Sequence, residues 1–362
     1  MVAATVGISG VACIPLLYVV GTRIESQRAG IASALLFAIN VTAIAYSQEA
    51  RSYSLLLLLC LVSLLCFFRI RTGSTSAILI YALVSALAVY AHFFAIFFLL
   101  AQWLSVLSQP ASGIRELPWR KYLAAIFLTT CLISPALYYM AFRRTGQLAY
   151  ITRPHLHDLA QLLYFLTADG GRFRKPIALL YLFCCGAGVR RLILRLRTRD
   201  SSPQNTGQIL IIFCAVLPIV LTFLISFWVP IFFPRYLLIC LPPVVLLAGS
   251  GLAGFPSWAR SGLVLVMIGL SAGCVIWYYG HPNDDWRSLA AYVLKYAEPG
   301  DIIVGCPPGA EWPVQYYSAA MNSGKPPQFS YLTAPRLLQK LHSANNSALR
   351  FWVVAWGDKS GR

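Results

Sequence analysis

The sequence predicts an all-α polytopic membrane protein of about ten transmembrane helices, followed by a small C-terminal α/β domain. Hydrophobic residues occupy 58% of the 362 positions and charged residues 11%, and the mean hydropathy is +0.68. Soluble domains do not sustain such values over this length. The apolar segments are continuous and do not alternate in units of about ten residues, which excludes a membrane β-barrel.

The candidate membrane spans are apolar runs of roughly 16 to 21 residues, several of them short enough to require tilt. Together they define a transmembrane domain over residues 1–280, and the hydrophilic remainder, residues 281–362, is predicted to form a second domain. The runs lie near 3–20, 29–47, 53–70, 76–91, 93–108, 122–140, 176–190, 208–228, 236–253 and 261–279.

Basic residues in the loops predict the orientation in the membrane, because cytoplasmic loops are enriched in Lys and Arg. One face carries thirteen of them and the opposite face eight, so the first face is predicted to be cytoplasmic and the protein to be a multi-pass protein of the plasma (inner) membrane. The thirteen are Arg23, Arg28, Arg69, Arg71, Arg115, Arg120, Lys121, Arg190, Arg191, Arg195, Arg197, Arg199 and Arg260; the eight are Arg51, Arg143, Arg144, Arg153, Arg172, Arg174, Lys175 and Arg235.

With this topology both chain ends lie outside, and no basic residue precedes the first span. Residues 1–5 also lack the charged leading region of a signal peptide. An additional span upstream would restore the usual arrangement. We therefore expect that the chain lacks its natural N-terminus.

Two regions interrupt the spans. Residues 141–175 are predicted to form an external loop, in which 156–166 has the pattern of an amphipathic interfacial helix. In the hydrophilic tail, helix and strand patterns alternate, which predicts a small α/β layer on the outer face. Its helices are predicted at 288–298, 310–321 and 335–343, and its strands at 301–305 and 349–355.

The densest group of reactive side chains in the first 140 residues lies between two spans, in the segment YSQEARSY, which carries Tyr46, Gln48, Glu49, Arg51 and Tyr53. Charged groups are costly in hydrocarbon, so this segment should lie where two helices meet at a water interface. A carboxylate there can act as a general base, or orient a leaving group or a metal. The alternative is a structural Glu49–Arg51 pair, which would need an unwound turn because residues two apart do not face each other on a helix. We predict that the segment forms one wall of an active site on the non-cytoplasmic face.

Two further positions are candidates for the same site. Arg235 and Tyr236 follow Pro234 at the start of a span, where a guanidinium can either bind a substrate phosphate or extend to the phosphate of a membrane lipid. His92 lies at the outer turn between two spans, beside Tyr90. It is either a structural histidine of an apolar face or a residue that binds a ligand or transfers a proton.

Composition and motifs limit the other kinds of site. The net charge is +17, from 29 basic and 12 acidic residues, but the charge is spread over short loops, so nucleic-acid binding is not predicted. No CxxC or HExxH pattern occurs, and the segment from His155 to Asp158 (HLHD) fits a solvated helix face better than a metal site. No cofactor is evident, and a divalent metal stays open.

Four motifs resemble, in order, the bacterial members of glycosyltransferase family 39, a GT-C group related to the protein O-mannosyltransferases and the lipid A aminoarabinose transferases. They are YSQEARSY with AHFF about forty residues later, FPRYLL at 233–238, DDWRSLAAYV at 284–293, and PGDIIV at 299–304 followed by Tyr316 and Tyr317. The resemblance covers nearly the whole chain. It implies transfer of a sugar from a polyprenyl-phosphate carrier at the outer face of the membrane.

The resemblance implies catalytic roles for Glu49 and His92. It implies substrate-binding roles for the other candidate residues, which are Tyr46, Gln48, Arg51, Tyr53, Arg235 and Tyr236. The family's catalytic base lies in an acidic loop after its first span, and nothing in this chain matches that loop. The first span and its loop are therefore expected to be absent, and this chain by itself to be inactive if nothing replaces them.

Three functions follow as hypotheses. The first is a membrane glycosyltransferase that takes a hexose or pentose from a polyprenyl phosphate and transfers it to a protein, lipid or glycan acceptor. The second is a transporter or flippase of lipid-linked sugars, which should show charged residues deep within spans or broken helices at matching positions. The sequence shows almost none of these features. The third is a non-catalytic remnant that binds lipid or a partner.

Overall fold

The protein is described here from a computed structural model, in which the chain divides into two compact units, Met1–Gly280 and His281–Arg362. The residues described are 2–49, 51–71, 74–108, 118–142, 151, 153–198, 202–281, 285–298, 301–306, 310–321, 330–333 and 350–355.

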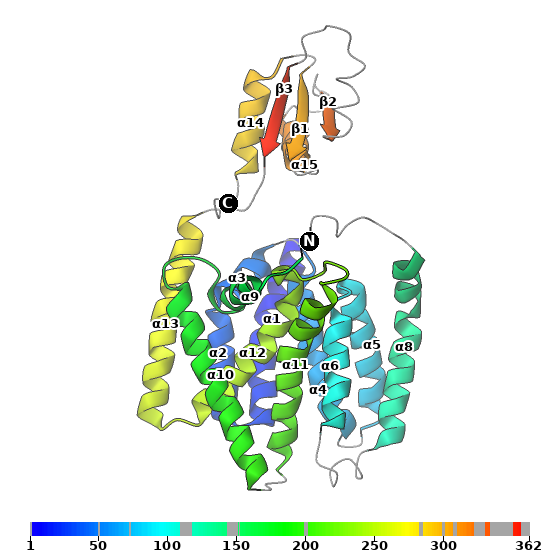
Figure 1. Cartoon of the computed structure of the whole chain (residues 1–362), viewed down its shortest axis with the longest axis vertical. Coiled ribbons are helices and arrows are strands. Elements are labelled where there is room, and N and C mark those ends of the chain that lie inside the picture. The colour runs from blue at the N-terminus through cyan, green and yellow to red at the C-terminus, as the bar shows by residue number, and fades with distance from the viewer. Residues whose placement is uncertain are drawn as a thin grey trace. The chain divides into compact units, whose positions relative to one another are not determined.

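The first unit is a bundle of helices (Figure 1). Long apolar runs form helices readily here because a membrane requires every backbone polar group to be satisfied within the segment. The elements are α1 (Val2–Ile24), α2 (Gln27–Ala38), α3 (Val41–Gln48), α4 (Tyr53–Arg71), α5 (Ser76–Ala91), α6 (Ala95–Leu107), α8 (Trp119–Phe142), α9 (Leu156–Ala168), α10 (Arg174–Arg197), α11 (Pro203–Ile225), the 3-10 helix η1 (Pro234–Cys240), α12 (Leu241–Ala253) and α13 (Ser257–Gly280).

All ten predicted spans are helical, and the prediction of a polytopic membrane protein is confirmed. Among the described residues, seven helices are long and apolar enough to cross a membrane, or eight if α2 and α3 count as one bent span. The remaining two, α5 and α6, have 16 and 13 residues. At 1.5 Å per residue, α6 is about 20 Å long, which is shorter than a hydrocarbon core of about 30 Å.

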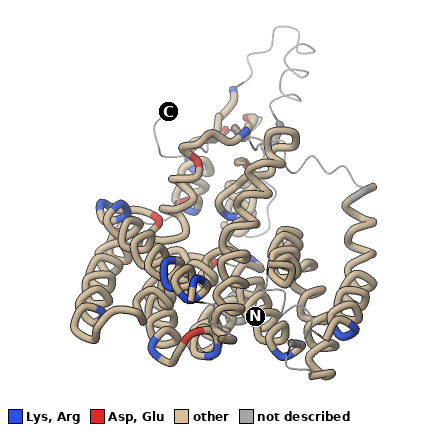
Figure 2. Tube along the Cα trace, turned by 60° about the horizontal axis from the view of Figure 1, so that its bottom comes forward, with Lys and Arg blue, Asp and Glu red and all other residues tan. Residues whose placement is uncertain are grey.

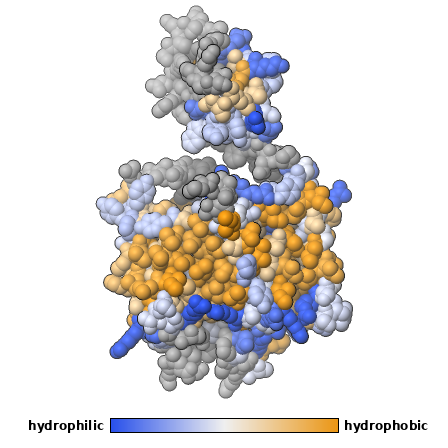
Figure 3. Space-filling view, turned by 180° about the vertical axis from the view of Figure 1, so that it is seen from behind, coloured by the Kyte–Doolittle hydropathy of each residue, from blue (hydrophilic) through white to orange (hydrophobic). Residues whose placement is uncertain are grey.

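The helices run alternately in opposite directions, so their connections gather at two ends of the bundle (Figure 1). We call one the Tyr46 end; it holds α3, α9, the α5–α6 turn and the segment from α11 to η1. The other is the Glu25 end, which holds the turns after α1, α4, α6, α10 and α12. Figure 2 brings the Glu25 end forward and shows many Lys and Arg around it. An apolar belt lies between the two ends on the face that Figure 3 shows.

The predicted span 29–47 is not one straight helix, because α2 and α3 meet at a bend of 58°. Asn40 caps α3 by accepting a hydrogen bond from the backbone of Ala43 at 2.9 Å. Its amide group also donates to the carbonyls of Leu166 and Thr167, at 3.0 and 3.2 Å, and Thr42 donates to that of Phe165. The carbonyls of a last helical turn have no partner within their helix, so α9 holds the bend in place.

The amphipathic helix predicted at 156–166 is present as α9. Its first turn uses the HLHD segment for capping: the backbone of His155 donates to Asp158 at 2.7 Å, and His157 pairs with the same carboxylate at 3.0 Å. These side chains therefore start a helix, as the interpretation of a solvated face expected.

The second unit contains α14 (Trp286–Tyr296), β1 (Ile302–Cys306), α15 (Glu311–Met321), β2 (Ser330–Thr333) and β3 (Phe351–Ala355). The strands form a small parallel sheet in the order β2-β1-β3. Apolar residues of both helices and of the sheet, including Val293, Ile303 and Val314, form its core. Strand β2 was not predicted, and the helix predicted at 335–343 lies outside the described residues.

Candidate active site at the Tyr46 end of the bundle

Arg235 and Tyr46 come together at the Tyr46 end although 189 positions separate them. The guanidinium Nε of Arg235 donates to the phenol oxygen of Tyr46 at 3.2 Å. Pro234 begins η1, where its missing N–H costs nothing, and this start directs Arg235 toward α3. Tyr46 is buried and Arg235 is half-buried, with its guanidinium 5.8 Å from the ring of Phe233. The cation is therefore held by an aromatic and a phenolic partner, and the Glu49 carboxylate attracts it electrostatically.

Aromatic rings connect this pair to the other predicted residues. Tyr46 packs edge-on against Tyr53 at 5.1 Å, and Tyr53 lies 5.5 Å from His92. His92 in turn lies 5.1 Å from Tyr236, which packs against Phe94 at 4.8 Å. The start of α4, the α5–α6 turn and η1 thus meet in one continuous row of rings.

His92 is neutral at physiological pH and is oriented by its own turn. Burial lowers the pKa of His92 to about 4, because desolvation disfavours the charged ring. The backbone N–H of Phe94 donates to its Nδ1 at 3.3 Å. A neutral imidazole that accepts at Nδ1 carries its proton on Nε2, so the outer nitrogen is a hydrogen-bond donor.

Glu49 and Arg51 form an ion pair at 3.2 Å, with side chains 36% and 50% exposed. Helix α3 ends at Gln48 and α4 begins at Tyr53, so the pair occupies the unwound turn that the alternative of a structural Glu49–Arg51 pair required. Ser52 and Ser54 fix this turn by donating to the carbonyls of Ala91 and Tyr46, at 2.9 and 2.8 Å. Both charged groups stay accessible to a ligand.

Gln48 donates to the phenol oxygen of Tyr279 at the end of α13. Tyr279 therefore ties α13 to α3.

Asp169 is a residue of this region that the predicted site did not include. It follows α9 directly, and its carboxylate lies close enough to interact electrostatically with Tyr46. The next two residues, Gly170 and Gly171, have positive φ angles of 105° and 73° and pack against Trp277. A side chain at Gly170 would collide with that indole, so the DGG sequence fixes where the carboxylate lies. Two glycines after an acidic residue were the available signal.

The arrangement can bind a phosphate and handle a proton. Arg235 and Arg51 are cations suited to phosphate oxygens, Glu49 and Asp169 are proton acceptors, and His92 is a neutral donor. Within the described residues no group of three His, Cys, Asp or Glu side chains could hold a metal ion.

No protein-family model matches the chain, and no curated protein matches it significantly in sequence. Solved structures do match. ArnT from Cupriavidus metallidurans in the apo state has a TM-score of 0.53 at 12% identity, covering 95% of this chain and 80% of ArnT. The oligosaccharyltransferase of Archaeoglobus fulgidus in the apo form has a TM-score of 0.51 at 12% identity, covering 92% of this chain and 54% of the transferase. Its complex with Zn and sulfate gives a TM-score of 0.50 at the same identity, covering 92% and 51%.

At 12% identity these likenesses establish the fold and not the reaction. Both proteins are GT-C-fold glycosyltransferases. The predicted fold class is confirmed: the chain is a multi-pass helical membrane protein with the GT-C fold.

Proposed function

We propose that the protein is a membrane glycosyltransferase that moves a sugar from a polyprenyl-phosphate carrier to an acceptor at the outer face of the plasma (inner) membrane. The observation that carries the proposal is the meeting of Arg235, Tyr46, Glu49 and His92 at one end of a GT-C bundle. The excess of Lys and Arg at the Glu25 end supports an outward-facing Tyr46 end.

Arg235 and Arg51 would bind the phosphate of the donor. Phosphate is recognised well by guanidinium groups, and Arg235 is already positioned by Tyr46 and Phe233. Gln48, Tyr53 and Tyr236 would line the same surface and contact the sugar. The apolar helices beneath would hold the isoprenoid tail.

In the transfer step an acceptor oxygen attacks the anomeric carbon while the bond from that carbon to the phosphate oxygen breaks. The electron pair of the breaking bond leaves with the polyprenyl phosphate, and Arg235 stabilises this negative charge. The proton of the acceptor hydroxyl passes to a carboxylate, for which Glu49 is our candidate. A single displacement of this kind inverts the configuration and needs no enzyme-bound sugar.

His92 would donate a hydrogen bond through Nε2 rather than accept the proton of the acceptor. Its depressed pKa and the Nδ1 contact with Phe94 both support the donor role. A donor at this position would stabilise an oxygen on which charge develops.

Membership of glycosyltransferase family 39 remains a proposal that rests on the four motifs. So do the hexose or pentose donor and an acceptor that is a protein, lipid or glycan. The structure adds the shared fold to those motifs.

The experiment uses membranes that contain the chain and two separate readouts. Binding of radiolabelled polyprenyl phosphate tests the phosphate site, and transfer from radiolabelled polyprenyl-phosphate sugars tests the reaction. Arg235→Ala should weaken binding about tenfold to a hundredfold, because a hydrogen bond to a charged group contributes about 1.5–3 kcal/mol. Glu49→Gln should retain binding and lose transfer.

Arg260→Ala is the matched control, since this arginine lies at the Glu25 end and donates to the carbonyl of Phe255. Loss of binding by Arg260→Ala as well as Arg235→Ala, or unchanged transfer in both Glu49→Gln and Arg235→Ala, would refute the assignment.

The transporter hypothesis gains one observation, the broken pair α2 and α3. A transporter built from two structural repeats would need a second broken helix at the corresponding position of the other repeat. Among the described helices, α2 and α3 form one such pair and no second pair is found. Movement of labelled carrier across vesicles without sugar transfer would favour the transporter. Binding without transfer or movement would favour a non-catalytic lipid-binding protein.

A further inference from the structure

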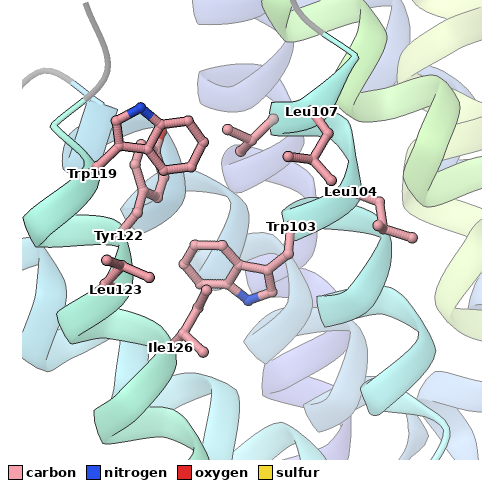
Figure 4. A pocket seen from close by; sticks show the side chains of 8 residues that line it. Trp103, Leu104, Leu107, Trp119, Tyr122, Leu123 and Ile126 are labelled. Carbon is pink, nitrogen blue, oxygen red and sulfur yellow. The ribbon is translucent and has the colours of Figure 1, made fainter. Parts of the chain in front are cut away.

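A pocket of about 180 Å³ lies between the end of α6 and the start of α8, at the Glu25 end (Figure 4). Its walls are apolar and aromatic. They include Trp103, Leu107, Trp119, Tyr122, Leu123 and Ile126. On α8 the residues lie three or four positions apart, so one stripe of that helix forms a wall.

Aromatic rings pack closely beneath the pocket, and its walls provide few hydrogen-bond partners for water. The ring of Trp103 lies 5.1 Å from that of Phe67 and 5.6 Å from that of Tyr122. Nearby, Tyr81 donates to Gln102, and Gln102 donates to Ser63, both at 2.8 Å. A cavity of about 150 Å³ with apolar walls stays dry and takes up hydrocarbon.

The pocket opens toward the membrane. Leu107 is 63% exposed and Leu123 is 61% exposed, on two helices of a multi-pass membrane protein. Helix α8 has 24 residues and is about 36 Å long, whereas α6 is only about 20 Å long. A short helix beside a long one leaves apolar surface for lipid to cover.

Two cations close to the pocket in the sequence select among lipids. Arg120 and Lys121 follow Trp119 directly in the first turn of α8, and Arg120 is exposed. They share the first turn of α8 with Trp119 and Tyr122, which line the pocket, at the basic end of the bundle. Paired with a hydrocarbon slot, they match a molecule that has a negative headgroup and an apolar chain.

We propose that this pocket binds one acyl chain of an anionic phospholipid from the leaflet at the Glu25 end, with the headgroup phosphate on Arg120 and Lys121. The site is separate from the candidate transfer site, because α6 begins beside His92 and ends at the pocket. It is therefore independent of the proposed function.

The test places the full chain in nanodiscs that contain a phosphatidylglycerol with a photoactivatable group on the first carbons of one acyl chain, and repeats it with the matching phosphatidylcholine. Crosslinks from phosphatidylglycerol should concentrate on peptides that contain Leu107 and Leu123. Ile126→Trp fills the slot and should abolish them. Leu137→Trp is the matched control on the same helix, with the same exposed fraction of 38%.

Arg120→Gln tests the headgroup contact without changing the slot. It should lower phosphatidylglycerol labelling about fivefold and leave phosphatidylcholine labelling unchanged. Equal labelling by both lipids, retention of the crosslinks in Ile126→Trp, or displacement of the label by polyprenyl phosphate would each overturn the proposal. The last outcome would assign the pocket to the isoprenoid carrier.

Discussion

Glu25 and Glu49 both pair with arginine, at opposite ends of the same bundle, and their surroundings differ. The side chain of Glu25 is 3% exposed; it forms an ion pair with Arg191 at 2.9 Å and receives hydrogen bonds from two nitrogens of Arg195 at 2.6 and 2.9 Å. Gln208 donates to the same carboxylate. Glu49 is 36% exposed and pairs with Arg51 two positions away.

The contrast separates a structural ion pair from a candidate site. The Glu25 cluster (Glu25, Arg191, Arg195, Gln208 and Ser250) joins α1, α10, α11 and α12, and its carboxylate oxygens are satisfied by the chain itself. Removing one partner from such a buried group leaves charges uncompensated. At the Tyr46 end the charged groups stay partly open, as binding a ligand requires. The two regions contain the same residue types. They differ in how deeply the carboxylate is buried and in whether its oxygens already have hydrogen-bond partners within the chain.

The largest effect is expected at the Glu25 end. Glu25→Ala should destabilise the folded protein by about 3–5 kcal/mol, because it removes a buried carboxylate and leaves the half-buried Arg191 and Arg195 without their counter-charge. Glu49→Ala should cost about 1 kcal/mol or less, since exposed pairs contribute little. Thermal unfolding in detergent measures both. If both variants lost the same amount of unfolding free energy, the difference in burial between Glu25 and Glu49 would not affect stability.

The next effect concerns pH at the Tyr46 end. His92 titrates near 6.5 when unfolded and at about 4 when folded, so between these values the unfolded state binds more protons. The free energy of unfolding should therefore fall as the pH drops from about 6.5 to about 4, by at most about 3 kcal/mol. His92→Gln should remove this contribution, and His157→Gln, whose side chain is 57% exposed, should leave it. The measurement is the unfolding midpoint of the parent and of both variants across this pH range.

Asn40 sharpens the comparison, because it joins α9 to the bend that carries the site. Asn40→Ala should cost about 2 kcal/mol, since it removes a helix cap and leaves the carbonyls of Leu166 and Thr167 without their donor. Ser26→Ala, the cap of α2 at the Glu25 end, should cost about 1 kcal/mol and leave donor binding unchanged. If Asn40→Ala and Ser26→Ala had the same unfolding free energy and the same donor affinity, the bend between α2 and α3 would not position the candidate site.

The smallest effect is expected for Tyr46→Phe. This change removes the acceptor for Arg235 and keeps the ring contacts with Tyr53 and Phe165. One hydrogen bond contributes about 1 kcal/mol, so binding of polyprenyl phosphate should weaken about fivefold. Tyr18→Phe in α1 is the control. An unchanged affinity in Tyr46→Phe would mean that the phenol does not position Arg235.

Much of the fold could be predicted because a membrane imposes it locally. Each apolar run had to become a helix, and each did, including the interfacial α9. The bend between α2 and α3 could not be predicted, because its partners, the carbonyls of α9, lie more than 120 positions away. The Glu25 cluster was missed for the same reason: its arginines follow by about 170 positions and look like ordinary loop charges.

The sequence alone determined the class of protein, the helical segments and which residues could carry charge chemistry, since hydropathy and residue type are local properties. Tertiary structure decided which of these residues meet. It brought Arg235 to Tyr46 and placed Asp169 beside them through two glycines, and it gave Glu25 and Glu49 different roles. The physical reason is that burial and hydrogen-bond partners depend on distant segments, which only packing brings together.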